Sequence, residues 1–271
     1  MSLFRLGPHR FARGIHRNVS ADGIVDVSET DGVRALHIDS DTIQSAMRLN
    51  APHDLELTYT RGMMMFLLFY PQARKLLLLG LGGGSIPKFV HHYLPEHTIR
   101  TVEINPQVIT IARSHFQLPD DDARLQTTEA DGIVYLREHP GEFDVVLHDA
   151  YGGQGLPEEL GSQTFFDTCA EALADDGMLV VNLWGSDKQF DARRQRIERS
   201  FEQRVLVLPT GHPGNIVVFG FRRTPSDMRI ATLRENAKKL QATLKIEFLE
   251  FTERLRDHNR RTPSRLLIGT Q

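Results

Sequence analysis

Apolar runs and amphipathic segments alternate along the middle of the chain. The four consecutive leucines in residues 75–79 predict a strand that is buried on both faces of a parallel sheet. Further strands are expected, in chain order, at residues 99–104, 125–129, 143–149 and 177–184. Helices are expected to begin after the first four strands and again at residues 191–201. Strands that alternate with helices predict an α/β fold with a mostly parallel sheet.

Shorter patterns flank this region. Residues 23–29 and 33–38 alternate around Asp31-Gly32, which is typical of a β-hairpin, and residues 39–44 lead into another strand. Residues 1–20 are basic and weakly patterned, so we expect a loosely held arm. The chain therefore divides into an arm with a small antiparallel β region (1–54), a main α/β domain (55–224) and a helical extension (225–271).

Three further elements complete the expected fold. Residues 55–70 predict one helix whose methionines and phenylalanines are buried. Residues 205–208 and 216–221 predict an antiparallel hairpin at the edge of the sheet. Residues 226–258 predict one or two helices, capped by Ser226 and Asp227, whose many charges form a solvated face.

A glycine-rich turn follows the leucine strand and indicates a ligand site. Gly80, Gly82 and Gly84 let bare backbone approach a ligand before the next helix begins. Glu103 ends the second strand, where a carboxylate can accept hydrogen bonds from both hydroxyls of a ribose. This pattern predicts a nucleoside-binding unit of the kind that class I S-adenosylmethionine enzymes use.

Other ligands fit the turn less well. A dinucleotide fingerprint needs glycine or alanine at its last position, which is Ser85 here. A nucleotide phosphate at the start of the helix, or a glycine turn without any ligand, are the remaining alternatives.

Two aspartates follow the next strands of the sheet. Asp131 can accept a hydrogen bond from the exocyclic amine of adenine, but it is also a good N-cap for the helix behind it. Asp149 has glycines close behind it, which leave space beside its carboxylate, and its alternative role is as a helix cap or in a turn. The carboxyl ends of parallel strands meet at one edge of a sheet, so these groups are expected to lie together.

Composition excludes several classes of function. The net charge of −3 gives no electrostatic reason to expect binding to nucleic acid or to a membrane surface. No apolar stretch is long enough to span a bilayer, and no secretion signal is recognised at the N-terminus. Cys169 is the single cysteine, which fits a reducing cytoplasm and a small buried residue. The histidines lack metal-ligand spacing, so no metal is expected.

The sequence resembles the spermidine synthases, the polyamine aminopropyltransferases, from about residue 34 to residue 221. The resemblance rests on LHIDSDTIQ ending at Gln44, the glycine turn, TVEINPQVI at 101–109, ADG at 130–132, FDVVLHD at 143–149 and QTFF at 163–166. It implies a class I methyltransferase-like domain behind an N-terminal β domain. It also implies decarboxylated S-adenosylmethionine as donor substrate and a small-molecule amine as acceptor. A homodimer is expected on this likeness alone.

The resemblance also assigns roles to individual residues. Glu103 is implied to bind the ribose, Asp131 the adenine, and Gln44 to line the donor pocket. Asp149 matches the first Asp of the Asp-x-x-Asp motif, whose carboxylate helps to deprotonate the attacking amine. Tyr59 matches an aromatic residue beside that amine.

Four positions depart from the family pattern. Gly83 stands where the family has an Asp that binds the aminopropyl ammonium, and Gly152 replaces the second carboxylate of Asp-x-x-Asp. Thr60-Arg61 replaces His-Glu, and Gly211-His212 lies where the family has a tyrosine. The lost charge-assisted hydrogen bonds are each worth about 1.5–3 kcal/mol, so ordinary putrescine chemistry is in doubt.

Three hypotheses follow. The first is an aminopropyltransferase with an altered acceptor, with Asp149 as base and Tyr151 as a wall facing the cation. The second is an S-adenosylmethionine-dependent methyltransferase, because Gly83 leaves room for the carboxylate of the full cofactor. The third is a non-catalytic nucleoside-binding homologue.

Overall fold

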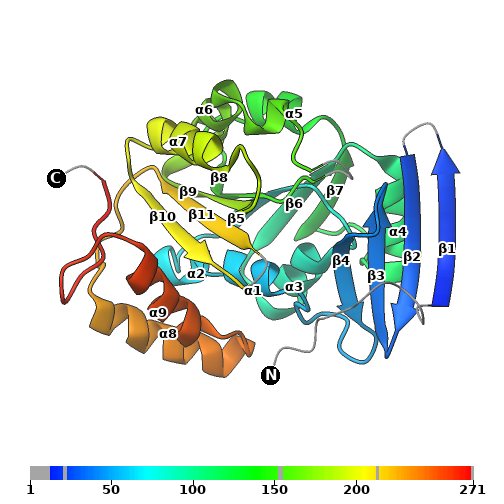
Figure 1. The fold of residues 1–271 in the computed structure, drawn as a ribbon, viewed down its shortest axis with the longest axis horizontal. Coiled ribbons are helices and arrows are strands. Elements are labelled where there is room, and N and C mark those ends of the chain that lie inside the picture. Colours follow the sequence, from blue (N-terminus) through cyan, green and yellow to red (C-terminus); the bar gives the residue numbers. More distant parts are fainter. Residues whose placement is uncertain (1–12, 21–22, 152–154, 212–213, 270–271) are drawn as a thin grey trace.

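The computed structural model describes residues 13–20, 23–151, 155–211 and 214–269. Its main sheet has the strand order β10-β11-β9-β8-β5-β6-β7. The parallel strands are β5 (Lys75–Leu79), β6 (Thr98–Glu103), β7 (Leu125–Glu129), β8 (Phe143–His148) and β9 (Leu173–Trp184). Strands β10 (Val205–Pro209) and β11 (Asn215–Phe221) form an antiparallel hairpin beside β9 (Figure 1). The predicted α/β sheet and its antiparallel edge are confirmed.

Helices cover both faces of this sheet (Figure 1). Helices α5 (Gly132–Glu138), α6 (Gln163–Ala172) and α7 (Phe190–Ser200) pack on one face. The other face packs against α1 (Thr58–Met63), α2 (Phe66–Phe69), α3 (Ser85–Tyr93), α8 (Ile230–Leu244) and α9 (Phe248–His258). The leucines of β5 alternate between the two cores: Leu76 and Leu78 face one, Leu77 and Leu79 the other. This double burial explains why the four positions after Lys75 are all apolar.

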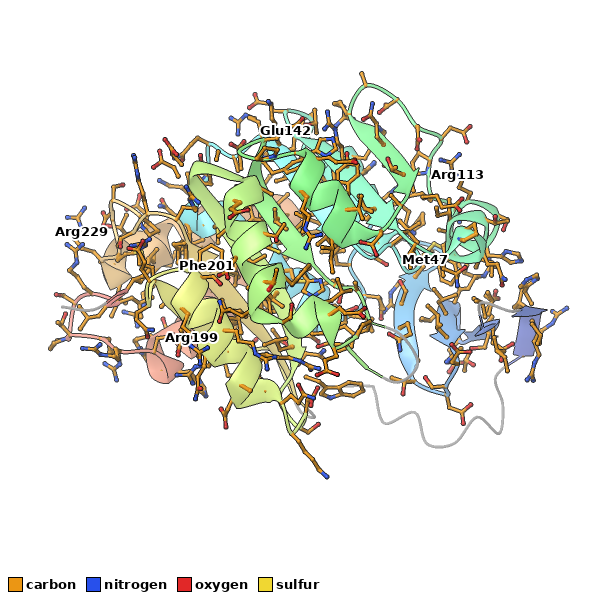
Figure 2. The ribbon with its side chains drawn as sticks, turned by 90° about the horizontal axis from the view of Figure 1, so that it is seen from above. Met47, Arg113, Glu142, Arg199, Phe201 and Arg229 are labelled. Atoms are coloured by element: carbon orange, nitrogen blue, oxygen red, sulfur yellow. The ribbon has the colours of Figure 1, made fainter. Side chains whose placement is uncertain are left out.

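A small antiparallel sheet precedes the main domain. It contains β1 (Arg13–Ser20), β2 (Gly23–Thr30), β3 (Val33–Ile38) and β4 (Ile43–Arg48) in chain order. Asp31 and Gly32 both have positive φ, which is the geometry of the tight hairpin that their sequence predicts. Met47 of this sheet packs with Phe116 at the end of α4 (Pro106–Phe116), and α4, which carries Arg113, lies at this junction in Figure 2.

The structure corrects three of the sequence predictions. Residues 13–20 form a strand paired with β2 rather than a loose arm. The single helix expected at 55–70 is two short helices, because Met64 and Met65 make tighter bonds to carbonyls three residues back. Helix α8 begins at Ile230, and the carboxylate of Asp227 accepts from the backbone N–H of Arg229 instead of capping the helix.

The C-terminal helices are more than a solvated surface. Phe248, Phe251 and Leu255 of α9 are fully buried in the core below the main sheet. Cys169 of α6 is also fully buried, as expected, and burial raises the pKa of its thiol. In the part of the chain that the structure describes, no helix is long and apolar enough to cross a membrane.

Candidate active site

A cavity of about 430 Å³ opens at the carboxyl ends of the parallel strands. Its walls come from β4, the turn after β5, and the ends of β6, β8 and β9, as expected for an open parallel sheet. The predicted residues Gln44, Tyr59, Gly80, Gly82, Glu103, Asp131, Asp149 and Tyr151 all line it. Gly84 is the left-handed residue just before α3 and helps to form the turn.

Glu103 braces the glycine turn. Its Oε2 atom accepts a hydrogen bond from the backbone N–H of Leu81 at 2.9 Å, and its Oε1 accepts from that of Asn105 at 2.9 Å. Burial raises the pKa of Glu103, while these backbone N–H groups oppose the shift. Each carboxylate oxygen still has a lone pair that can accept a hydrogen bond from a hydroxyl of a ligand.

The glycines of the turn are required by the backbone. Gly80 has φ of 87°, and a Cβ at this position would lie 2.6 Å from the carbonyl oxygen of Asp149. Gly82 and Gly84 also have positive φ, at 52° and 69°. Side chains here would be strained and would separate the turn from the end of β8.

Asp131 has the capping role that the sequence left open. Its Oδ1 atom accepts hydrogen bonds from the backbone N–H groups of Ile133 at 2.8 Å and Val134 at 3.0 Å. It is the N-cap of α5, so the capping interpretation is confirmed. Its side chain is also exposed to the cavity, and contact with adenine stays a prediction.

Asp149 is held by two side chains rather than by a turn. The Tyr59 hydroxyl donates to Oδ2 at 3.0 Å, and the Asn182 amide donates to Oδ1 at 2.9 Å. Burial raises the pKa of Asp149 to about 7, against the lowering effect of these two hydrogen bonds. The carboxyl group can therefore accept a proton near neutral pH, which an ordinary aspartate does poorly.

The two tyrosines occupy different positions around Asp149. The pKa of Tyr59 is raised well above its ordinary value, first by burial and then by the charge of Asp149, so it stays a donor. The Tyr151 hydroxyl donates to the Asn182 carbonyl at 3.0 Å and accepts from the Trp184 N–H at 3.1 Å. Its hydroxyl is thus bound to β9, and its ring lines the cavity.

Sequence reasoning missed the two asparagines at this edge. Asn182 is 3% exposed, and its Oδ1 accepts from the side-chain amide of Asn215 at 2.9 Å. The available signal was a single amide inside the otherwise apolar run at 177–184. Its partner Asn215 comes from the hairpin, and only the folded sheet brings the two together.

The structure closes the position where the family pattern has an Asp. A Cβ on Gly83 would lie 2.8 Å from both the Phe116 ring and the Ser45 hydroxyl. Ser45 and Ser85 hydrogen bond to each other through their hydroxyls at 3.2 Å. These neutral groups, rather than a carboxylate, stand beside this part of the cavity.

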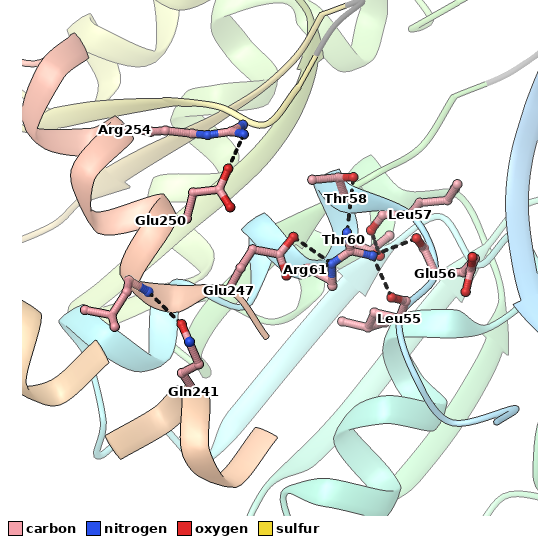
Figure 3. Close-up of polar contacts among 11 residues, drawn as sticks. Leu55, Glu56, Leu57, Thr58, Thr60, Arg61, Gln241, Glu247, Glu250 and Arg254 are labelled. Carbon is pink, nitrogen blue, oxygen red and sulfur yellow. Dashed lines mark hydrogen bonds and ion pairs between the residues drawn. The ribbon is translucent and has the colours of Figure 1, made fainter. Parts of the chain in front are cut away.

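The side chains of Thr60 and Arg61 bind neighbouring backbone and the C-terminal extension (Figure 3). Thr60 donates its hydroxyl to the carbonyl of Leu57 at 2.7 Å. The Arg61 guanidinium binds the carboxylate of Glu247 at 2.9 Å and the carbonyl of Glu56 at 2.7 Å. Arg61 therefore joins α1 to the C-terminal extension instead of serving the acceptor.

The other residues that depart from the family pattern are only partly described by the structure. Gly152 and His212 lie outside the described residues, while Gly211 is exposed. In the described lining, the charged side chains are all acidic: Asp39, Glu103, Asp131, Asp149 and Glu159. The cavity therefore favours cationic ligands. Within the described residues, no cluster of three or more histidine, cysteine or acidic side chains is arranged to hold a metal ion.

Comparison with known proteins identifies the family. The chain matches the spermine/spermidine synthase domain over residues 56–210. It belongs to that family. A polyamine aminopropyltransferase of Chromobacterium violaceum is 40% identical over 260 residues, which cover 96% of this chain and 100% of the relative. The family resemblance is confirmed, and the chain is a transferase.

Methyltransferases of this fold are similar as well. A mouse eEF1A lysine and N-terminal methyltransferase is 30% identical over 183 residues, which cover 63% of this chain and 26% of the relative. A crystal structure of spermidine synthase in complex with the transition state analogue AdoDATO has a TM-score of 0.68 at 22% identity. That match covers 89% of this chain and 85% of the other. A crystal structure of human methyltransferase-like protein 13 in complex with SAH has a TM-score of 0.63 at 24% identity and covers 70% of this chain and 93% of the other. The two matches confirm the methyltransferase-like fold.

Proposed function

We propose that this transferase binds decarboxylated S-adenosylmethionine and transfers its aminopropyl group to an amine. The observation that carries the proposal is Asp149, a carboxyl group with pKa of about 7 at the wall of an acidic cavity. The relative from Chromobacterium violaceum, which the chain covers completely, is named a polyamine aminopropyltransferase. A sulfonium donor and an amine acceptor are both cations that such a cavity attracts.

The donor half of the site has the groups that an adenosyl ligand requires. Glu103 would accept hydrogen bonds from the ribose hydroxyls. The Oδ2 atom of Asp131, which does not cap α5, would accept a hydrogen bond from the adenine amine. The backbone of Gly80 and Gly82 lines the cavity and would come close to the ligand, and Gln44 lines the cavity from the small sheet. All of these groups lie at the carboxyl edge of the sheet.

The acceptor half supplies the base. In the reaction, the amine nitrogen forms a bond to the carbon beside sulfur, the carbon–sulfur bond breaks, and methylthioadenosine leaves. The sulfonium already activates that carbon, so the protein must mainly align the reactants and remove a proton from the amine. Asp149 would take this proton, while the rings of Tyr59 and Tyr151 would face the cation.

We further propose that the acceptor differs from putrescine. Around Asp149, the described lining contributes the neutral side chains of Thr60, Asn182 and Trp184. None of these three side chains offers a carboxylate to a second ammonium, and Gly152 stands where the family has the second carboxylate of Asp-x-x-Asp. This favours an amine whose remote end is uncharged.

Methyl transfer from S-adenosylmethionine is the second candidate function. The neutral Ser45 and Ser85 hydroxyls favour it, because hydroxyls can donate to the carboxylate of the full cofactor. The similarity to the mouse methyltransferase points in the same direction.

Thermal shift measurements with three compounds test these proposals. A ligand that binds only the folded protein raises its melting temperature by mass action. We expect decarboxylated S-adenosylmethionine and methylthioadenosine to stabilise the protein, and S-adenosylmethionine to stabilise it less. Preference for the carboxylated cofactor would support methyl transfer, and the absence of stabilisation by all three would refute the nucleoside site.

We also propose a cytoplasmic location for this enzyme. Cys169 has no cysteine partner in the chain, so the protein needs no oxidising compartment to form a disulfide within it. Fractionation of cells that produce the protein, followed by immunodetection, would test this directly.

A further inference from the structure

We propose that Asn215 is a positioning residue for the transfer reaction, because it holds the amide of Asn182 in the orientation that donates a hydrogen bond to Asp149. This inference rests on the proposed role of Asp149 as proton acceptor. It extends the site to a residue that has no direct contact with the carboxylate.

The three side chains form a directed chain of hydrogen bonds. The Asn215 Nδ2 atom donates to Asn182 Oδ1 at 2.9 Å, and Asn182 Nδ2 donates to Asp149 Oδ1 at 2.9 Å. The other Asp149 oxygen accepts from Tyr59 at 3.0 Å. Because Asn182 is only 3% exposed, water cannot readily replace either of its partners.

Asn215 is itself fixed by the sheet. It begins β11 and lies opposite Trp184 of β9, so it is a diagonal neighbour of Asn182 on the same face. Its carbonyl oxygen accepts from both the backbone N–H and the hydroxyl of Thr210, each at 2.9 Å. The hairpin therefore fixes the backbone of Asn215 relative to β9 and places its side chain within hydrogen-bond reach of Asn182.

The orientation of the Asn182 amide determines whether it stabilises the ionised or the protonated form of Asp149. With its NH₂ toward Asp149, Asn182 stabilises the ionised carboxylate. If the amide turned over, its oxygen would face Asp149 and would favour the protonated acid. With Asn215 in the orientation that the structure shows, the NH₂ of a turned Asn182 would oppose the NH₂ of Asn215, so Asn215 disfavours turning of Asn182 alone.

The remaining groups around Asp149 do not substitute for this hydrogen bond. Tyr59 and Tyr151 are neutral donors or neighbours whose pKa values are raised by burial, and Glu103 lies across the same cavity. The ring of His148 contacts the carbonyl of Leu160, and burial lowers its pKa to about 4. In the described lining no lysine, arginine or histidine faces the carboxylate. Loss of the Asn182 donor should therefore raise the pKa of Asp149.

Two variants test the inference. In Asn215→Asp, a carboxylate of the same shape accepts from Asn182 Nδ2 and turns the amide, so that its oxygen faces Asp149. We expect the acidic limb of the kcat/KM profile to move up by about one pH unit or more, with activity recovered at high pH. Asn215→Ala adds no charge but releases the amide, and a smaller upward shift is expected.

The pKa of Asp149 can also be measured without turnover. Its carboxyl carbon can be followed by ¹³C NMR in the ligand-free protein and assigned by its absence from Asp149→Asn. A higher pH midpoint for the titration of Asp149 in both Asn215 variants than in the wild type would support the inference. An unchanged midpoint in folded Asn215→Ala would refute it, even if Asn215→Asp shifts, because added charge alone would then explain that shift. If the wild type has no aminopropyl transfer activity, the proposed function fails, but this titration still decides the role of Asn215.

Discussion

Replacement of Asp149 by asparagine separates proton transfer from ligand binding. The substitution preserves the shape of the side chain and two of its contacts. The new amide oxygen can accept from Asn182, and its NH₂ can donate to the Tyr59 oxygen. The Tyr59 hydroxyl can then turn to the carbonyl of Gln44, which lies 3.4 Å away. The fold should survive this change.

The size of the catalytic loss follows from the pKa values. An alkyl ammonium has a pKa of about 10.4 and an ordinary aspartate one of about 3.9, so proton transfer between them costs about 9 kcal/mol. With a pKa of about 7, Asp149 lowers this cost to about 5 kcal/mol. Removal of a positioned base typically reduces the rate by about 10²–10⁴-fold. We expect Asp149→Asn to lose kcat by this factor and to bind methylthioadenosine as the wild type does.

The same substitution should stabilise the protein at neutral pH. Burial raises the pKa of Asp149 in the folded state, so the folded protein binds more protons than the unfolded chain between about pH 4 and 7. The stability that this group contributes therefore falls as pH rises through that window. Asparagine does not titrate, so the variant should have the higher Tm at pH 8, and the difference should shrink toward pH 4.

Three assays check this prediction. The rate of product formation gives kcat and kcat/KM across pH, calorimetry gives the affinity for methylthioadenosine, and thermal melting gives Tm. In the wild type, kcat/KM should rise as pH increases through about 7, because Asp149 must be ionised to accept the proton. Turnover by Asp149→Asn close to the wild-type rate, with the same acidic limb, would refute the role of this carboxylate.

Four other substitutions test separate parts of the structure. Glu103→Gln should weaken methylthioadenosine binding at least tenfold in calorimetry, because one oxygen that accepts hydroxyls becomes a donor; unchanged affinity would contradict the ribose role. Gly80→Ala should lower the unfolding free energy by about 1–3 kcal/mol in urea titrations, since φ is 87° and the end of β8 is too close. Gly83→Ala should lower Tm through contact with the Phe116 ring, and an unchanged Tm would show that this position is open. Arg61→Met should destabilise the protein by about 1–3 kcal/mol but leave ligand affinity intact, with Arg61→Lys as the milder control.

Local patterns were sufficient to predict most of the sheet. The leucines of β5 and the Asp31-Gly32 turn are governed by burial and by backbone geometry, which act over a few residues. The break between α1 and α2 falls at Met64 and Met65, which are fully buried in the core, so it depends on packing that a local pattern does not report. The strand at residues 13–20 was not predicted for a related reason. It is held by pairing with β2, and its own sequence has little alternation of apolar and polar residues.

The residues of the candidate site also fall into those that the sequence could predict and those that it could not. Glu103 and Asp149 could be predicted because one ends a strand and the other follows one, and topology brings such strand ends together. Asn215 could not be predicted, because its effect needs the register between β9 and β11. The steric closure at Gly83 likewise comes from Phe116, a residue of a distant helix.

The most direct test of the account is identification of the product formed by the purified wild-type protein. Decarboxylated S-adenosylmethionine and S-adenosylmethionine would each be incubated with a panel of primary amines, and the products resolved by mass spectrometry. We predict methylthioadenosine and an aminopropylated amine from the decarboxylated donor, with amines that have an uncharged remote end preferred over putrescine. S-Adenosylhomocysteine with a methylated acceptor, and no consumption of the decarboxylated donor, would contradict the account.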